Sequence, residues 1–325
     1  MAENATSSWW HRLTSIAKVF FWVVLTLAVV QQVYGPSKPD AMRAAMLDRF
    51  QQERKSRVIA LIHRQDTVTL FGVPVSSSIS IEDSEAVLRA IRLTPEDRPI
   101  DVILHTPGGL VLASEQIAKA LVQRKAKVTA FVPHYAMSGG SLIALAADEI
   151  VMDPNAVLGP VDPQIGDWPA GSIVKLPELK KRAAISDEML ILMDVAAKAR
   201  IQVGVFVAEV LRKRLPRDKA ITLATALTEG RWTHDFPITV ELARELGFPV
   251  STTMPRTVYD LMDLYPQGGK GRPSVLYVPL RPMQPSHGLA PTSPSAVPGA
   301  SQGRIRLEFR RLHPIALDSD HSRAI

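Results

Sequence analysis

One stretch of the chain decides its fold: HTPGGLVLASEQIAKAL (His105–Leu121), AKVTAFVPHYAMSGGSLIALAADEIVMD (Ala126–Asp153) and AVLGPVDPQIG (Ala156–Gly166). In its first two parts, a glycine turn follows a β-rich run and opens an apolar helical pattern. A strand that ends in such a turn and restarts as a helix leaves backbone N–H groups unpaired at the helix start. Together with the helix dipole, these N–H groups can stabilise a developing negative charge. The pattern therefore indicates a site for chemistry as well as a fold.

The same alternation of strand and helix extends over the middle of the chain. Runs rich in β-branched and apolar residues predict strands at 57–63, 100–105, 127–133 and 149–152. Helical spacing of apolar residues predicts helices at 81–92, 113–123, 141–147, 186–215 and 239–246. Ser186 is the expected N-cap of the longest helix, and Gly247 ends the last one. This order is typical of an α/β domain with a largely parallel sheet.

An apolar segment near the N-terminus predicts a transmembrane helix. The segment Ile16–Tyr34 is about twenty residues long, the length that one bilayer crossing requires, and Lys18 is its one charged residue. No small-x-small cleavage site follows it, which argues against a signal peptide. More basic residues follow the segment than precede it, so the positive-inside rule places the bulk of the chain in the cytoplasm. The basic residues that follow are Lys38, Arg43, Arg49 and Arg54.

Composition sets the remaining boundaries and excludes several kinds of site. We expect an N-terminal segment with the transmembrane helix (1–35), a helical connector (36–56), the α/β domain (57–265) and a disordered Pro/Gly/Ser-rich tail (266–325). The net charge is +6, but eight basic and three acidic residues lie between Lys270 and Arg323, so no nucleic-acid partner is expected for the domain. The chain has no cysteine, P-loop, H-E-x-x-H or G-x-G-x-x-G pattern, and we expect neither a metal nor a cofactor.

Ser138 is the candidate nucleophile of the glycine turn that precedes residues 141–147. A nucleophilic serine needs a base, a group that orients the base, and donors for the oxyanion. Gly108, Gly109 and Gly139 supply backbone N–H groups in the two glycine turns. Both turns follow neighbouring strands of the predicted sheet, and α/β folds build their sites at the carboxyl ends of such strands.

Local sequence leaves the base open. His63, His105 and His134 lie at strand ends, where a histidine is often a structural residue. His234 stands in a polar turn before the helix 239–246, and Asp162 lies between two prolines in a loop. Spacing alone selects none of them.

The motifs HTPGG, AMSGG, AADEIVMD and LGPVDPQIG resemble those of the ClpP/crotonase-like serine peptidases. They are most similar to the serine dehydrogenase proteinase family, which is related to signal peptide peptidase A, and the resemblance covers residues 57–265. It implies a ClpP/crotonase-like spiral core, a polypeptide substrate and a homo-oligomer. The family's Ser, Asp, His order matches Ser138, Asp162 and His234, and its oxyanion hole falls on Gly108, Gly109 and Gly139.

Together these features predict a membrane-anchored serine endopeptidase. A Ser–Lys dyad, as in signal peptide peptidase A, is an alternative, with Lys175 first and then Lys180 and Lys181 in the expected window. A non-catalytic membrane scaffold with the same fold is another, and so is acyl-CoA chemistry, because the crotonase fold also uses paired glycine turns as an oxyanion hole. The scaffold and the acyl-CoA enzyme do not require the hydroxyl of Ser138.

Overall fold

The computed structural model of the chain describes residues 18, 20–24, 26, 38–63, 68–70, 73–75 and 78–265. The chain divides into two units, 1–273 and 274–325, and all of these residues belong to the first unit. The predicted tail and most of the predicted transmembrane segment lie outside the described residues. Among the residues described, no helix has both the length and the apolar character that a membrane crossing requires.

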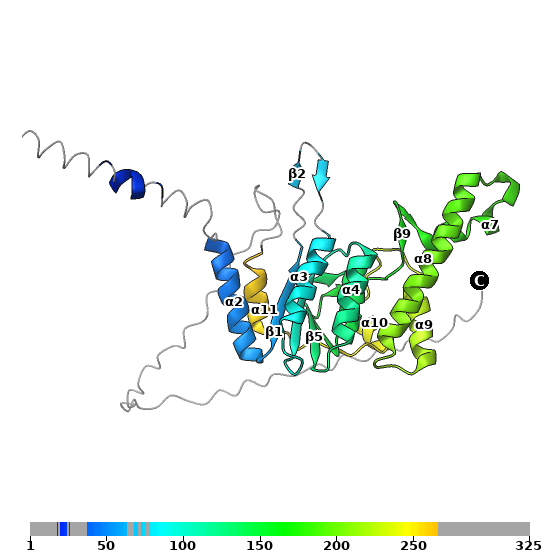
Figure 1. Cartoon of the computed structure of the whole chain (residues 1–325). Helices are drawn as coiled ribbons and strands as arrows, with labels where there is room; N and C mark the ends of the chain where they lie inside the picture. Colours follow the sequence, from blue (N-terminus) through cyan, green and yellow to red (C-terminus); the bar gives the residue numbers. More distant parts are fainter. Residues whose placement is uncertain are drawn as a thin grey trace, which may run out of the picture. The chain divides into compact units, whose positions relative to one another are not determined.

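A five-stranded parallel sheet forms the centre of the domain (Figure 1). Its order is β1 (Arg57–Ile62), β4 (Ile100–His105), β5 (Val128–Val132), β7 (Glu149–Met152) and β11 (Val250–Ser251), and every neighbouring pair is parallel. The α/β class and the parallel sheet are therefore confirmed. The expected strands match β1, β4, β5 and β7 within a residue of each bound, whereas β11 was not predicted.

The main helices follow the predicted order. They are α2 (Lys38–Arg54), α3 (Ile81–Arg92), α4 (Val111–Val122), α5 (Gly139–Ala146), α8 (Asp187–Leu211), α9 (Arg217–Thr228), α10 (Val240–Glu245) and α11 (Arg256–Met262). Ser186 caps α8 as predicted, because its hydroxyl accepts a hydrogen bond from the Met189 N–H at 3.3 Å. Helices α9 and α11 were not predicted.

Short elements connect the main ones. They are β2 (Val68–Leu70) paired with β3 (Val73–Val75), β6 (Tyr135–Ala136) with β8 (Val157–Leu158), β9 (Gln164–Ile165) with β10 (Trp168–Pro169), and the helices α6 (Ala170–Val174) and α7 (Leu176–Leu179). The β6–β8 pair continues from the end of β5 and leads the chain toward the start of α5. It therefore helps to fix the turn that holds Ser138.

Successive residues of the central strands enter two cores, one on each face of the sheet. In β4, Val102 and Leu104 belong to the larger core, which also contains buried side chains of α3, α4, α5, α8 and α9. Ile103, between them, belongs to a smaller core together with Phe131 of β5. This alternation is the period of two that a strand imposes, and burial of both faces explains the nearly continuous apolar runs.

Helix α2 is part of the domain rather than a free connector. Phe50 is 1% exposed and meets the ring of Phe131 edge to face, with centroids 5.5 Å apart. The Arg43 guanidinium donates to the carbonyl of Leu264 at 2.8 and 2.9 Å, which links α2 to the segment after α11. The folded unit of the described chain therefore begins before residue 57.

Candidate active site

Ser138 occupies a strained turn directly before α5. Its φ of 51° and ψ of −119° lie in a region that side-chain-bearing residues rarely adopt, at a cost of about 1–3 kcal/mol. The turn is closed by a hydrogen bond from Gly140 N–H to the Met137 carbonyl at 2.7 Å. A Cβ on Gly139 would lie 2.2 Å from the Ser114 hydroxyl, so glycine is required where α5 packs on α4. The surrounding packing holds the strained serine in place.

The second glycine turn lies against Ser138. Gly108 has a φ of +106°, and a Cβ there would lie 2.7 Å from the Cβ of Ser138. A Cβ on Gly109 would lie 2.3 Å from backbone atoms of Ile79, which pairs with this turn. Glycine is required at both positions because backbone approaches the turn closely from two sides. The two turns of the sequence pattern are thus in direct contact.

One cavity of about 240 Å³ joins residues that are far apart in the sequence. Among its lining residues are Ser138, Gly139, Gly109, Asp162 and His234. The structure therefore brings together the candidate nucleophile, the candidate base and its acidic partner. Neither Gly109 nor Gly139 has a hydrogen-bond partner for its N–H group within the described part of the chain. Both amides are therefore free to bind an oxyanion.

His234 is held by a buried carboxylate. Its Nδ1 donates to Asp162 Oδ1 at 2.8 Å, and the Asp162 side chain is fully buried. The His234 side chain stays 34% exposed and lines the cavity that contains Ser138. A buried carboxylate beside Nδ1 fixes the tautomer with hydrogen on Nδ1 and leaves Nε2 to accept a proton.

Comparison with known proteins identifies the family of this chain. A family profile described as "ClpP-like SDH-type serine proteinase" matches residues 8–289. The chain belongs to this family. Two uncharacterized proteins of Methanocaldococcus jannaschii are similar to this chain over most of their length. One is 52% identical, and the match covers 82% of this chain and 91% of the relative. The other is 51% identical, and the match covers 81% of this chain and 92% of the relative.

Two solved structures match part of this chain at low sequence identity. The 1510-N membrane-bound stomatin-specific protease is 20% identical, with a TM-score of 0.39 over 57% of this chain and 79% of its own. ClpP1 from Listeria monocytogenes is 16% identical, with a TM-score of 0.40 over 63% of this chain and 97% of its own.

Gln164 is a residue of the candidate site that sequence reasoning missed. Its Nε2 donates to Asp162 Oδ2 at 2.7 Å and lies 3.1 Å from His234 Nδ1. Because the hydrogen on His234 Nδ1 is donated to Asp162, Nδ1 does not accept a hydrogen bond from Gln164. The Gln164 amide instead donates to the second carboxylate oxygen of Asp162 and holds it in place. No local signal marks Gln164, because its role depends on a histidine seventy residues further along the chain.

Not all of the predicted site residues reach the Ser138 cavity. Gly108 N–H donates to Thr106 Oγ1 at 3.1 Å, so this amide is already paired and Gly108 is not a lining residue. The prediction of Gly108 as an oxyanion donor is corrected for this reason. Lys175 follows α6, is exposed and does not line the cavity, and the geometry therefore offers the Ser–Lys dyad no support.

The other histidines have structural surroundings. His63 is buried between Thr106 and Asp83. The rings of His105 and His134 stack with centroids 5.7 Å apart, and both contact Tyr135. None of the three histidines lines the Ser138 cavity.

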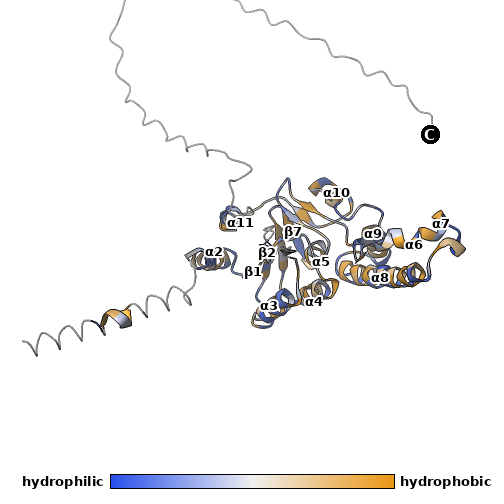
Figure 2. Cartoon of the chain, turned by 90° about the horizontal axis from the view of Figure 1, so that it is seen from above, coloured by the Kyte–Doolittle hydropathy of each residue, from blue (hydrophilic) through white to orange (hydrophobic). Residues whose placement is uncertain are grey.

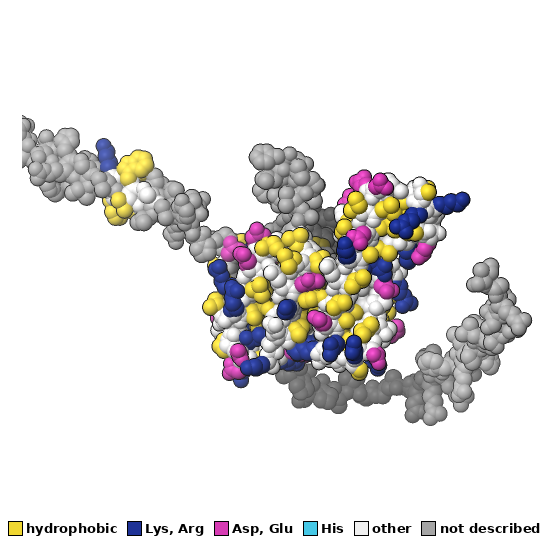
Figure 3. All heavy atoms as spheres, turned by 45° about the vertical axis from the view of Figure 1, so that its right-hand side comes forward, with side chains coloured by type: hydrophobic (Ala, Val, Ile, Leu, Met, Phe, Trp, Pro, Cys, Tyr) yellow, Lys and Arg dark blue, Asp and Glu magenta, His cyan; other side chains and the backbone are white. Residues whose placement is uncertain are grey.

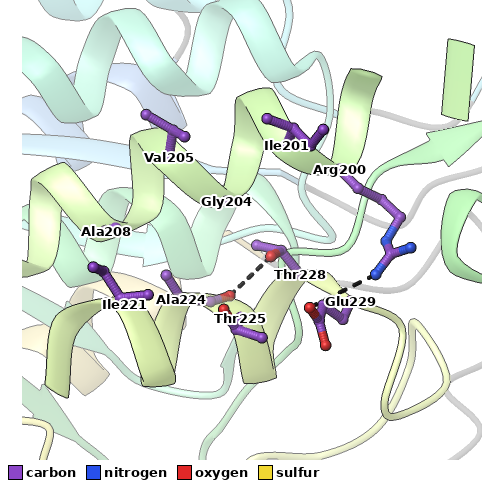
Figure 4. Close-up of a pocket in the computed structure, with 10 residues that line it drawn as sticks. All are labelled: Arg200, Ile201, Gly204, Val205, Ala208, Ile221, Ala224, Thr225, Thr228 and Glu229. Carbon is purple, nitrogen blue, oxygen red and sulfur yellow. Dashed lines mark hydrogen bonds and ion pairs between the residues drawn. The ribbon is translucent and has the colours of Figure 1, made fainter. Parts of the chain in front are cut away.

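Two further cavities adjoin α8. One, of about 740 Å³, shares Val111, Pro163, Gln164 and Val203 with the Ser138 cavity and continues it along α8. It is lined mainly by apolar side chains, and burial there raises the pKa of the Glu115 carboxyl. The other, of about 350 Å³, lies between α8 and α9 around Gly204, with Thr228 and Glu229 at one end (Figure 4). It contains none of the candidate catalytic residues.

Proposed function

We propose that this member of the serine proteinase family is a membrane-anchored endopeptidase that cleaves polypeptides through an acyl-enzyme on Ser138. One observation carries the proposal: Ser138 shares a cavity with His234, whose Nδ1 is hydrogen-bonded to the buried carboxylate of Asp162. A serine, an imidazole and a carboxylate in this relation are the parts that acyl transfer requires, whatever their order in the chain.

In the first half of the reaction, Ser138 Oγ attacks the scissile carbonyl carbon while His234 Nε2 accepts its proton. The N–H groups of Gly109 and Gly139 stabilise the oxyanion of the tetrahedral intermediate. The imidazolium of His234, stabilised by Asp162, then protonates the leaving amine. Water, activated by the same imidazole, attacks the ester and releases Ser138.

The adjoining groove supports an extended substrate. It begins at the Ser138 cavity and continues past Val111 and Val203, which line both spaces. Its mainly apolar lining suits peptide side chains better than the small polar groups of a metabolite. We therefore propose that the groove binds residues of an unfolded polypeptide next to the scissile bond.

The test is covalent labelling with a fluorophosphonate probe. Wild type should be labelled, and Ser138→Ala should lose both the label and the cleavage of an unfolded protein. Ser172→Ala is the matched control, because Ser172 is an exposed serine of α6 that does not line the cavity. Equal labelling of wild type and Ser138→Ala would refute the nucleophile. Full activity of His234→Ala with loss in Lys175→Ala would favour the dyad instead.

We also propose that the proteinase works as a homo-oligomer anchored by residues 16–34, with its domain in the cytoplasm. Exposed apolar side chains of α8 outside the groove support assembly: Ile191 is 66% exposed and Val195 is 42% exposed. Figure 2 shows much of α8 in the hydrophobic colour, and Figure 3 shows hydrophobic side chains interspersed with charged ones at the surface.

Two measurements test the anchor and the assembly. Carbonate extraction of membranes should leave the full chain in the pellet and release a chain without residues 1–35. Light scattering of that shorter chain should give a multiple of the monomer mass, which Ile191→Glu or Val195→Glu should reduce. A monomeric mass at all concentrations would contradict assembly through α8.

A further inference from the structure

A second series of hydrogen-bonded side chains reaches the Gly108–Gly109 turn. It begins at Asp83 in the first turn of α3, passes through His63 after β1, and reaches Thr106 after β4. His63 Nε2 is 3.3 Å from Asp83 Oδ2, and His63 Nδ1 is 2.8 Å from Thr106 Oγ1. His63 is 7% exposed and Thr106 is fully buried.

With one hydrogen on the His63 ring, the donors and acceptors of this series have one direction. Because a carboxylate only accepts, His63 Nε2 carries the hydrogen and donates to Asp83. His63 Nδ1 is then an acceptor and takes the hydroxyl hydrogen of Thr106. The Thr106 oxygen in turn accepts the N–H of Gly108 at 3.1 Å. The hydrogen bonds therefore run from the Gly108 amide to the carboxylate without a break.

Asp83 is itself fixed in place. Its Oδ2 accepts from the backbone N–H of Ser80 at 2.9 Å, and its own N–H donates to the Ser80 hydroxyl at 3.2 Å, which forms the capping box of α3. Ile79, directly before this cap, pairs with the glycine turn: its N–H donates to the Gly108 carbonyl at 2.7 Å. The start of α3 thus holds the turn in two ways: through the backbone hydrogen bond of Ile79, and through the hydrogen-bonded side chains of Asp83, His63 and Thr106.

From these contacts we propose that Asp83, His63 and Thr106 are positioning residues for the oxyanion hole. The proposal rests on the proposed function, in which the Gly109 N–H stabilises the oxyanion. The Thr106 hydroxyl fixes the orientation of the peptide at Gly108, and this peptide directly precedes the Gly109 amide. Since the Cβ position of Gly108 is only 2.7 Å from the Cβ of Ser138, a small rotation of the turn changes the distance from the donor to the reacting carbonyl.

Thr106→Val is the direct test, because valine keeps the shape of threonine and removes only the hydroxyl. It leaves the Gly108 N–H and His63 Nδ1 without their partner, and the turn keeps only its backbone hydrogen bonds with Ile79. Removal of an oxyanion donor lowers turnover by about 10²–10³-fold, so a misplaced donor should lower it by about 10- to 100-fold. Thr106→Ser keeps the hydroxyl and should stay within about threefold of wild type.

Fluorophosphonate inactivation of the full chain separates this role from a merely structural one. The maximal inactivation rate should fall in Thr106→Val, whereas the probe concentration for half-maximal rate should stay within about twofold. Thr129→Val is the matched control, because Thr129 is a buried threonine of β5 outside the site, and it should keep the wild-type rate. Melting temperatures are measured for every variant.

If Thr106→Val does not fold, His63→Leu provides the same test, because it removes the Nδ1 acceptor and roughly fills the space of the ring. It should also lower the maximal rate. Wild-type rates in the folded variant, or an equal loss in Thr106→Ser and Thr106→Val, would overturn the positioning role and leave Ser138 as the nucleophile. A wild-type chain that takes no label would overturn the proposed function and this inference together.

Discussion

Asp162→Asn should abolish the proposed peptidase activity by reversing the tautomer of His234. In the wild-type site, Asp162 Oδ1 accepts from His234 Nδ1 at 2.8 Å and Oδ2 accepts from Gln164 Nε2 at 2.7 Å. An asparagine has one oxygen for these two donors. If its amide nitrogen faced Gln164, two donors would meet in a fully buried position. The asparagine oxygen therefore takes the Gln164 side, and its N–H donates to His234 Nδ1.

A histidine that accepts at Nδ1 carries its hydrogen on Nε2 and cannot take the proton of Ser138. General base catalysis contributes about 10²–10⁴-fold to the rate. At 1.36 kcal/mol for each factor of ten, the loss corresponds to about 3–5 kcal/mol of transition-state stabilisation. The folded state should change little, since asparagine has the same shape and its oxygen keeps one of the two hydrogen bonds.

The structure also predicts a partial rescue. In Asp162→Asn/Gln164→Met the competing donor is absent, so the asparagine oxygen can return to His234 Nδ1 and restore the productive tautomer. We expect at least about tenfold recovery over Asp162→Asn alone, a non-additivity typical of residues in one network. The assay is the second-order rate of fluorophosphonate labelling, with Asp167→Asn, an exposed aspartate of the turn between β9 and β10, as the control.

Wild-type labelling of Asp162→Asn would refute the assignment of Asp162 as the orienting group. A double variant as slow as Asp162→Asn would refute the proposed part played by Gln164 but not the His234–Asp162 pair.

Three other outcomes follow from the contacts described. Gly108→Ala should lose labelling and about 2–6 kcal/mol of unfolding free energy, because its φ of +106° strains any side chain and the new Cβ would meet Ser138; unchanged urea denaturation would contradict this. Phe50→Ala should cost about 3–5 kcal/mol in the same assay, because α2 packs into the domain. Burial, together with the hydrogen bond to Asp153, raises the pKa of Tyr259 to about 12. The resulting stability is present below the usual tyrosine pKa of about 10 and is lost as the pH rises through about 12, so Tyr259→Phe should flatten the pH dependence of melting over this interval.

Several features of the fold could be predicted because their signals are local. Strands β4 and β7 and helix α3 have the bounds expected from the sequence, since strand and helix periods are visible within a single element. Other elements carry weaker local signals. Strand β11 has two residues and is defined only by its pairing with β7, and the Phe50 contact that makes α2 part of the domain lies on a strand eighty residues away.

By itself, the sequence determined the α/β class, the two glycine turns and the hydroxyl of Ser138 between strand and helix. Only the tertiary structure decided which partners reach that hydroxyl. It brings Asp162 to His234 across 72 residues of sequence and adds Gln164 to the pair. It also makes the two neighbouring glycines different, because the Gly108 N–H donates to Thr106 whereas the Gly109 N–H faces no partner in the described part of the chain. The physical reason is that a turn is specified by residues adjacent in the chain, whereas hydrogen bonds between distant residues depend on how the sheet and helices pack.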